Sequence, residues 1–204
     1  MAYYHDLITQ KSFEVLTALR RKYDFILIGG WAVFLYTHNL KSKDVDLVVE
    51  YKDLEKLKHD FEVVKNGRLK KYEIVTGEGA DIDIYVPFYS NPGLPAEELK
   101  NYVVSVENFK TVRAEVLAIL KQKAMEARTG SAKGKKDLID LLGLFALADF
   151  DFKRYRNLIK KYNLGKSLKF TRQKIAETVS IDEAGLNRHR MAAFKRRILP
   201  LLGD

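Results

Sequence analysis

A glycine pair placed between an apolar run and an acidic strand constrains the fold of this chain more than any other feature. Residues 25–28 (FILI) are apolar, Gly29 and Gly30 follow, and a second apolar run at residues 45–49 carries Asp44 before it and Asp46 within it. We read residues 24–50 as strand, tight turn, helix, basic loop and strand. Because alternate side chains of a strand share a face, we expect Asp44 and Asp46 to point to the same side.

Two carboxylates on one face of a strand indicate a site for a cation. They repel each other, and each raises the pKa of the other unless a cation lies between them. Mg²⁺ prefers oxygen ligands and is commonly bound by one or two carboxylates together with substrate phosphates. Glycines at the start of a helix let backbone N–H groups approach a phosphate closely. The stretch therefore predicts a metal–triphosphate site, with Mg²⁺ or Mn²⁺ as the metal ion.

A third acidic position follows in residues 80–86 (ADIDIYV), where Asp81 and Asp83 again alternate with apolar residues. We expect this strand to pair beside the strand of Asp44 and Asp46. Three carboxylates on adjacent strands can hold two metal ions, and the third can also take the proton of an attacking hydroxyl as general base. Asp81 and Asp83 project to one face, and we favour Asp83 because its strand is apolar on both sides of it.

Composition and charge narrow the classes of protein. The chain has no cysteine, which excludes disulfides and cysteine-bound metal clusters. No stretch approaches 18 uninterrupted apolar residues and the first ten residues lack a signal-peptide pattern, so we expect a soluble, cytoplasmic protein with no membrane contact. Residues 151–204 carry 14 Lys and Arg against 5 Asp and Glu, which accounts for the whole net charge of +9. This basic tail favours RNA or DNA as a partner; a solvated, lysine-rich surface is the alternative.

The hydrophobic pattern changes along the chain from mixed to helical. Before residue 110 we expect helices at 6–22 and 51–67, the second with Leu54, Leu57 and Phe61 facing inward, strands at 69–76 and 80–86, a turn at 77–79, a loop at 87–95 and a short edge strand at 103–106. From Val112 onward we expect helices at 113–128 and 136–149, separated by a loop at 129–136, and then three short basic helices. The predicted fold class is α+β, with a mixed sheet flanked by helices in domain 1–110 and an all-α domain at 111–204.

The order of these motifs resembles the nucleotidyltransferase superfamily, the DNA polymerase β-like enzymes. The shared pattern is a glycine pair that opens a helix, an Asp-x-Asp strand and a later single Asp in a strand. Within the superfamily the chain is most similar to the AbiEii/MenT-type group of nucleotidyltransferase toxins. The motifs that carry this similarity are Lys41-Ser42-Lys43-Asp44-Val45-Asp46, then Lys121 with Ala124 and Arg128, and finally Lys136, Asp137, Asp140 and Leu141.

The resemblance implies a role for each matching residue. Asp44 and Asp46 would be metal ligands and Asp83 the third carboxylate. Gly29, Gly30 and Ser42, with the basic position Lys41, would contact phosphates, and Lys121 would contact the triphosphate. Asp137 would join the cofactor-binding residues. Lys121 also fits a solvent-facing lysine, and Asp137 also fits an acid favoured by the dipole at a helix start. Two positions depart from the family pattern: lysine stands at Lys41 where arginine is usual, and Gly30 where a serine is common, so bidentate and hydroxyl contacts to phosphate are lost.

The function that the resemblance implies is transfer of a nucleoside monophosphate from an NTP to an acceptor hydroxyl, with release of pyrophosphate. The basic tail favours RNA as acceptor, and the toxin-like motifs favour a tRNA 3′ end and a type IV toxin–antitoxin role with an antitoxin protein as partner. Two alternatives stay open. One is an aminoglycoside-type nucleotidyltransferase, to which Gly29-Gly30-Trp31-Ala32 is also similar, and the other is a catalytically silent domain that binds RNA or a protein.

Overall fold

The computed structural model describes residues 2–76 and 80–203, with side chains from Leu7 onward. The chain divides into two compact units, Met1–Arg113 and Ala114–Asp204, and each is described by itself. The sequence placed the division between residues 110 and 111. No helix in the described ranges is both long and apolar enough to cross a membrane.

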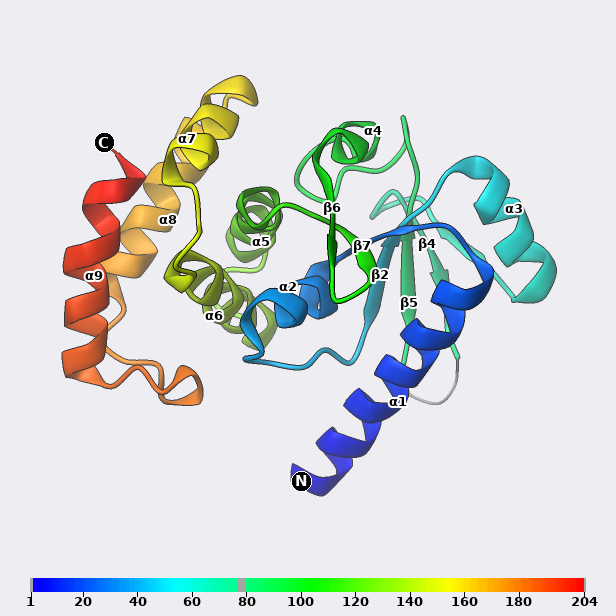
Figure 1. Cartoon of the computed structure of the whole chain (residues 1–204), viewed down its shortest axis with the longest axis horizontal. Coiled ribbons are helices and arrows are strands. Elements are labelled where there is room, and N and C mark those ends of the chain that lie inside the picture. Colours follow the sequence, from blue (N-terminus) through cyan, green and yellow to red (C-terminus); the bar gives the residue numbers. More distant parts are fainter. Residues whose placement is uncertain (1, 77–79, 204) are drawn as a thin grey trace. The chain divides into compact units, whose positions relative to one another are not determined.

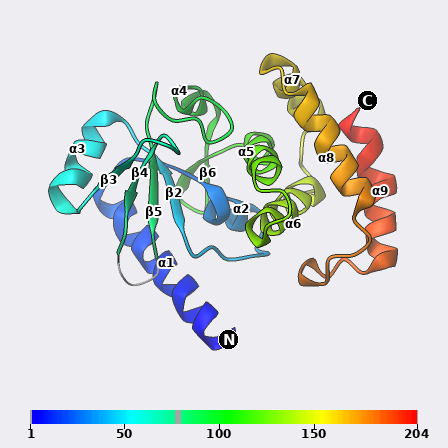
Figure 2. The same cartoon turned by 180° about the vertical axis from the view of Figure 1, so that it is seen from behind.

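A seven-stranded mixed sheet forms the centre of the first unit (Figures 1 and 2). Its strand order is β3-β4-β5-β2-β1-β7-β6. The strands are β1 (Ile26–Ile28), β2 (Val45–Val48), β3 (Val64–Asn66), β4 (Lys71–Ile74), β5 (Ile82–Tyr85), β6 (Val103–Val106) and β7 (Phe109–Val112). The helices of this unit are α1 (Ala2–Lys22), α2 (Gly29–Thr37), α3 (Tyr51–Asp60) and the short α4 (Ala96–Leu99), which runs into a 3₁₀ turn at Lys100–Tyr102. The predicted α+β class and the edge position of residues 103–106 are confirmed.

The central strands are buried because their apolar side chains share one face. Strand β1 pairs antiparallel with β2, and β2 pairs parallel with β5 in the register Val45↔Ile82 and Leu47↔Ile84. These four side chains are at most 1% exposed. Since neighbours in register point to the same side of a sheet, the residues between them, Asp46 among them, point to the other side. The apolar pattern thus fixes which face presents the acids.

The second unit is all-helical, as the sequence predicts. It comprises α5 (Ala114–Ala127), α6 (Ala132–Ala146), α7 (Phe152–Lys161), α8 (Gly165–Glu177), a 3₁₀ turn (Asp182–Ala184) and α9 (Arg188–Leu202). Phe145 and Tyr155 are almost fully buried and meet edge to face, with Phe150 against both rings. Figure 1 shows the long helices of this unit in green, yellow and red.

Three sequence expectations are corrected by strand pairing and helix capping. The predicted helix at 51–67 ends at Asp60, Phe61 is 37% exposed, and residues 64–66 form β3, which is stabilised by pairing with β4. Strand β7 was not predicted. It is joined to β6 by a tight turn in which Glu107 and Asn108 both have positive φ. Asn108 is the residue of this turn that could have indicated it in the sequence. The turn expected at 77–79 lies outside the described residues.

The third correction concerns the start of α6. The expected loop at 129–136 is shorter, because Ser131 caps the helix by accepting a hydrogen bond from the backbone N–H of Gly134 at 3.0 Å. A Cβ at Gly134 would lie 2.2 Å from the Arg128 carbonyl oxygen, which explains a glycine inside this helix. Asp137 therefore lies in the second turn of α6, and the helix-start interpretation of this acid is wrong.

Candidate active site

The turn from β1 into α2 brings the backbone of Gly29 against the side chain of Asp46. Ile28, the last residue of β1, is in register with Asp46 on β2. Gly29 has φ +71°, and a Cβ placed on it would lie 1.9 Å from Asp46 Oδ2. A side chain is thus excluded both by the backbone conformation and by the carboxylate. The glycine that the sequence singled out is required so that the first turn of α2 and the Asp46 carboxylate can lie together.

Substituting Gly29 is expected to disturb the fold and this acid together. Gly29→Ala should lower the free energy of unfolding by about 2–3 kcal/mol, because alanine is strained at positive φ and its methyl group overlaps the Asp46 carboxylate. Urea denaturation measures the change. Gly67→Ala is the matched control, since a Cβ there has no neighbour within 4 Å, and its expected effect is within about 0.5 kcal/mol. Equal stability of the two variants would contradict the close approach at Gly29.

Asp83 lies beside Asp46 across two parallel strands. The two residues are direct register partners on β5 and β2 and are both half-buried. Asp44 precedes β2 in a bend, and its negative charge interacts electrostatically with Asp83. Burial raises the pKa of Asp83, Lys71 opposes this, and the charge of Asp44 adds to the rise. The structure thus places Asp83 beside Asp46 and within electrostatic range of Asp44.

Asp81 and Asp83 are distinguished by their surroundings. Asp81 is exposed and precedes β5, and its carbonyl accepts a hydrogen bond from the backbone N–H of Val45 at 2.9 Å. Asp83 lies within β5 in register with Asp46. This geometry favours Asp83 as the third carboxylate.

Two further residues of the acidic face were missed by sequence reasoning. Lys71 on β4 places its Nζ 2.5 Å from Asp83 Oδ2 and 2.9 Å from Glu73 Oε1. Glu73 is itself in register with Asp83. Burial lowers the pKa of Lys71, but its hydrogen bonds to Asp83 and Glu73 outweigh that effect and raise it overall. The alternation of Lys71 and Glu73 within a predicted strand was the signal that could have identified them. The sequence does not show, however, which strand pairs with this one.

The remaining residues of this unit that the sequence proposed as phosphate contacts differ in burial. Gly30 is buried in α2, Ser42 is 5% exposed and Lys41 is exposed. Their roles as phosphate contacts stay predictions.

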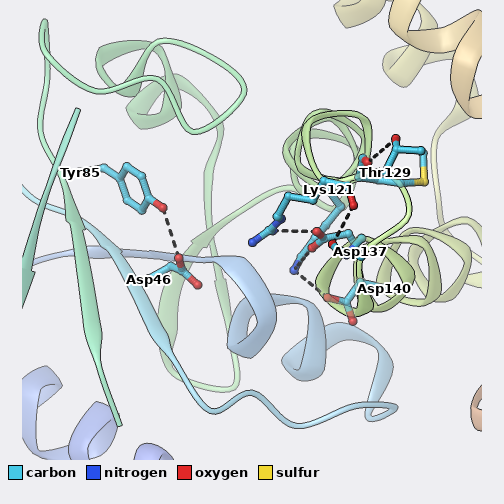
Figure 3. Close-up of polar contacts among 10 residues, drawn as sticks. Asp46, Tyr85, Lys121, Thr129, Asp137 and Asp140 are labelled. Atoms are coloured by element: carbon cyan, nitrogen blue, oxygen red, sulfur yellow. Dashed lines mark hydrogen bonds and ion pairs between the residues drawn. The ribbon is translucent and has the colours of Figure 1, made fainter. Parts of the chain in front are cut away.

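Tyr85 donates a hydrogen bond from its hydroxyl to Asp46 Oδ1 at 3.4 Å (Figure 3). Trp31, interpreted from the sequence as a core or pocket-wall residue, is 2% exposed and donates from Nε1 to Ser12 Oγ at 2.8 Å.

The acids fit a metal ion whose coordination is completed by substrate. Among the described residues no group of three or more His, Asp or Glu side chains is arranged to hold a metal ion. Asp46, which lies against Gly29 at the start of α2, and Asp44, two residues before it, are the carboxylates that would hold such an ion. Mg²⁺ sites that handle nucleotides commonly use one or two carboxylates and obtain their other ligands from phosphates and water. This donor set suits Mg²⁺ or Mn²⁺.

The predicted residues of the second unit form a buried ionic network (Figure 3). Lys121 on α5 places its Nζ 2.6 Å from Asp140 Oδ2 and 3.2 Å from Asp137 Oδ1, both on α6. Arg128 reaches Asp137 Oδ2 at 2.7 Å. Burial raises the pKa of Asp140, and the charge of Lys121 opposes the rise. The two downstream motifs therefore join the helices α5 and α6, and the solvent-facing interpretation of Lys121, whose side chain is 10% exposed, is wrong.

Comparison with known proteins gives a likeness in fold. No protein-family model matches the chain, and no curated protein matches it in sequence. Among solved structures it is similar to JHP933 from Helicobacter pylori, with 16% identity, a TM-score of 0.50, and 96% of this chain and 92% of that chain covered. It is also similar to an antigenic nucleotidyltransferase-like protein from Paracoccidioides brasiliensis, with 20% identity, a TM-score of 0.41, and 80% and 93% covered. The likeness to JHP933 shows that the fold is shared.

Proposed function

We propose that this protein is a metal-dependent nucleotidyltransferase that moves a nucleoside monophosphate from an NTP to an acceptor hydroxyl. The observation that carries the proposal is the placement of Asp46 in register with Asp83 and against Gly29 at the start of α2. A phosphate-accessible helix start next to paired carboxylates is what a bound metal–triphosphate requires. The motif order, and a structural neighbour described as nucleotidyltransferase-like, support the same activity.

The chemistry assigns distinct roles to the acids. The acceptor oxygen attacks the α-phosphorus of the NTP, a new P–O bond forms, the bond between the α-phosphorus and the bridging oxygen breaks, and pyrophosphate leaves. The hydroxyl proton passes to the Asp83 carboxylate, whose basicity is increased by burial. Asp44 and Asp46 would hold a divalent ion, which when bound offsets the negative charge of the triphosphate. Gly29, Gly30, Ser42 and Lys41 orient the phosphates.

Lys121 is proposed as the triphosphate contact and Asp137 as its support. Two carboxylates hold the ammonium of Lys121, so its position is fixed by packing between α5 and α6. A lysine held in one place loses little conformational entropy when it binds an anion. In the structure two carboxylates of α6 compensate its positive charge, so the proposed triphosphate contact rests on the motif resemblance.

RNA is the proposed acceptor because the positive charge is concentrated in the exposed surface of the second unit. Lysines 153, 160, 161, 166 and 169 and arginines 188, 190, 196 and 197 are all exposed. A surface of this kind binds polyanions and tracks a phosphate backbone. The motif resemblance extends the proposal to the tRNA 3′ end as acceptor and to a cytoplasmic toxin whose partner is an antitoxin protein.

Transfer of label from each of four α-³²P-labelled NTPs tests the activity. The full chain is incubated with Mg²⁺ and total cellular RNA, and a parallel reaction contains EDTA. We expect one nucleotide to enter RNA, with label migrating at tRNA size, and no incorporation with EDTA. Label in protein or in a small molecule would replace RNA as acceptor, and label in no fraction would contradict the proposed activity.

A charge-matched pair of variants tests the RNA contact. Lys160→Gln, Lys166→Gln and Lys169→Gln combined should weaken RNA binding and make the slope of log K against log salt shallower by about 2, since each lost phosphate contact removes about 0.7 from the slope for single strands. Lys65→Gln, Lys70→Gln and Lys100→Gln combined remove the same charge from exposed positions of the first unit. Filter binding at several salt concentrations measures both. Equal effects would show that net charge alone attracts RNA.

A further inference from the structure

The ammonium of Lys71 is bound to Asp83, the third carboxylate of the site. Its Nζ lies 2.5 Å from Asp83 Oδ2 and 2.9 Å from Glu73 Oε1, and its side chain is 12% exposed. The ammonium therefore binds two carboxylates on the acidic face of the sheet, at distances typical of charge-assisted hydrogen bonds.

Strand register makes this position part of the site. Glu73 on β4 is in register with Asp83 on β5, and Asp83 is in register with Asp46 on β2, so the three acids form one row across neighbouring strands. Lys71 precedes Glu73 by two residues on the same strand and shares its face. The row has Gly29 beside the Asp46 end and Lys71 at the Asp83 end.

A metal ion and the lysine ammonium compete for the same oxygen. A second divalent ion on Asp83 would have to displace Lys71 from Oδ2 and leave a largely buried ammonium with weakened partners, which is costly. Asp83 and Glu73 already share one cation, the Lys71 ammonium. The positive charge at this end of the row is therefore supplied by a side chain.

We propose that Lys71 takes the place of a second metal ion at Asp83, so that the site binds one divalent cation, at Asp44 and Asp46. The inference rests on the proposed function and deepens it. Lys71 acts as a positioning residue: it orients the Asp83 carboxylate toward the acceptor hydroxyl and supplies the positive charge that a metal ion supplies in a two-metal site. Glu73 holds Lys71 in place from the neighbouring position.

Counting bound metal ions tests this proposal without an activity assay. Mn²⁺ alone is titrated into the full chain, and the electron paramagnetic resonance signal of free Mn²⁺ gives the number bound. We expect one Mn²⁺ for the wild type and two for Lys71→Met, because removal of the ammonium frees Asp83 and Glu73 for a second ion. Lys71→Gln, which keeps hydrogen-bond donors without the charge, should also bind two and serves if the methionine variant fails to fold. Thermal denaturation confirms folding of each variant.

Two lysine controls separate charge from position. Lys71→Arg keeps the cation and should bind one Mn²⁺, and Lys70→Met removes the charge of the exposed neighbouring lysine and should also bind one. Two ions on the wild type, or one ion on both folded Lys71→Met and Lys71→Gln, would overturn the inference and leave the proposed function standing. No ion on the wild type would contradict the metal dependence of the proposed function itself, and the inference with it.

Discussion

Asp46→Asn is expected to reduce kcat/KM for nucleotidyl transfer by about 10³-fold or more, since the loss of a metal-binding carboxylate removes several kcal/mol of transition-state stabilisation. The amide is isosteric with the carboxylate, so contact with Gly29 and the hydrogen bond from Tyr85 have the same space available. The expected loss is therefore electrostatic. Incorporation of label at several Mg²⁺ concentrations measures it, and unfolding in urea confirms that the variant is folded.

The neighbouring acid Asp81 provides the matched control for this prediction. Asp81→Asn removes the same charge from an exposed residue directly before β5, the strand that pairs with the strand of Asp46. Its expected effect on kcat/KM is less than about threefold, because an exposed charge interacts weakly through solvent. If the protein is a toxin, the wild type should arrest growth when expressed, Asp46→Asn should not, and Asp81→Asn should. Comparable activity of Asp46→Asn and wild type would remove Asp46 from the site.

Lys121→Met is expected to lower the free energy of unfolding of the helical unit by about 3–5 kcal/mol, the usual cost of removing one partner from a buried ion pair. Asp140 is 1% exposed at its side chain and lies 2.6 Å from the Lys121 ammonium. Methionine matches the length of lysine, so little cavity forms and the loss arises from the uncompensated Asp140 carboxylate. Urea denaturation followed by circular dichroism measures the change in the helical signal.

Two further variants identify the origin of that loss. Lys121→Met combined with Asp140→Asn should recover a large part of the stability, because the buried negative charge is removed as well. Lys123→Met, on the same helix, breaks only a partly exposed pair with Glu126 and should cost no more than about 0.5 kcal/mol. Full stability of Lys121→Met would show that the ion pair contributes nothing to the fold. If the KM for NTP is unchanged in Lys121→Arg, the positive charge of residue 121 is sufficient for the proposed triphosphate contact.

Much of the candidate site could be predicted from local sequence patterns, because hydrophobic alternation and turn chemistry involve only a few neighbouring residues. Gly29 was marked by its place between an apolar run and a helix, and the structure adds that both positive φ and the Asp46 carboxylate require it. Asp46 and Asp83 were each marked by alternation with apolar residues. The ranking of Asp83 above Asp81 followed from the same alternation, since only a residue within the apolar run lies in the strand core.

Helix boundaries and edge strands were predicted less well because they depend on partners distant in sequence. Residues 64–66 are mostly polar, and only pairing with β4 makes them a strand. Strand β7 pairs with both β6 and β1, and its own sequence is too short to show periodicity. At Ser131 the capping signal was present, but glycine and lysine residues after it favoured a loop.

The sequence by itself determined the α+β class, the glycine turn and the presence of three acidic positions, since hydrophobic period and turn chemistry are local properties. Tertiary structure alone decided that Asp46 is in register with Asp83, that Lys71 binds Asp83, and that Lys121 is buried between two acids. The physical reason is that register is fixed by hydrogen bonds and apolar packing between strands far apart in the chain. A lysine becomes a site residue only when that packing places carboxylates around it.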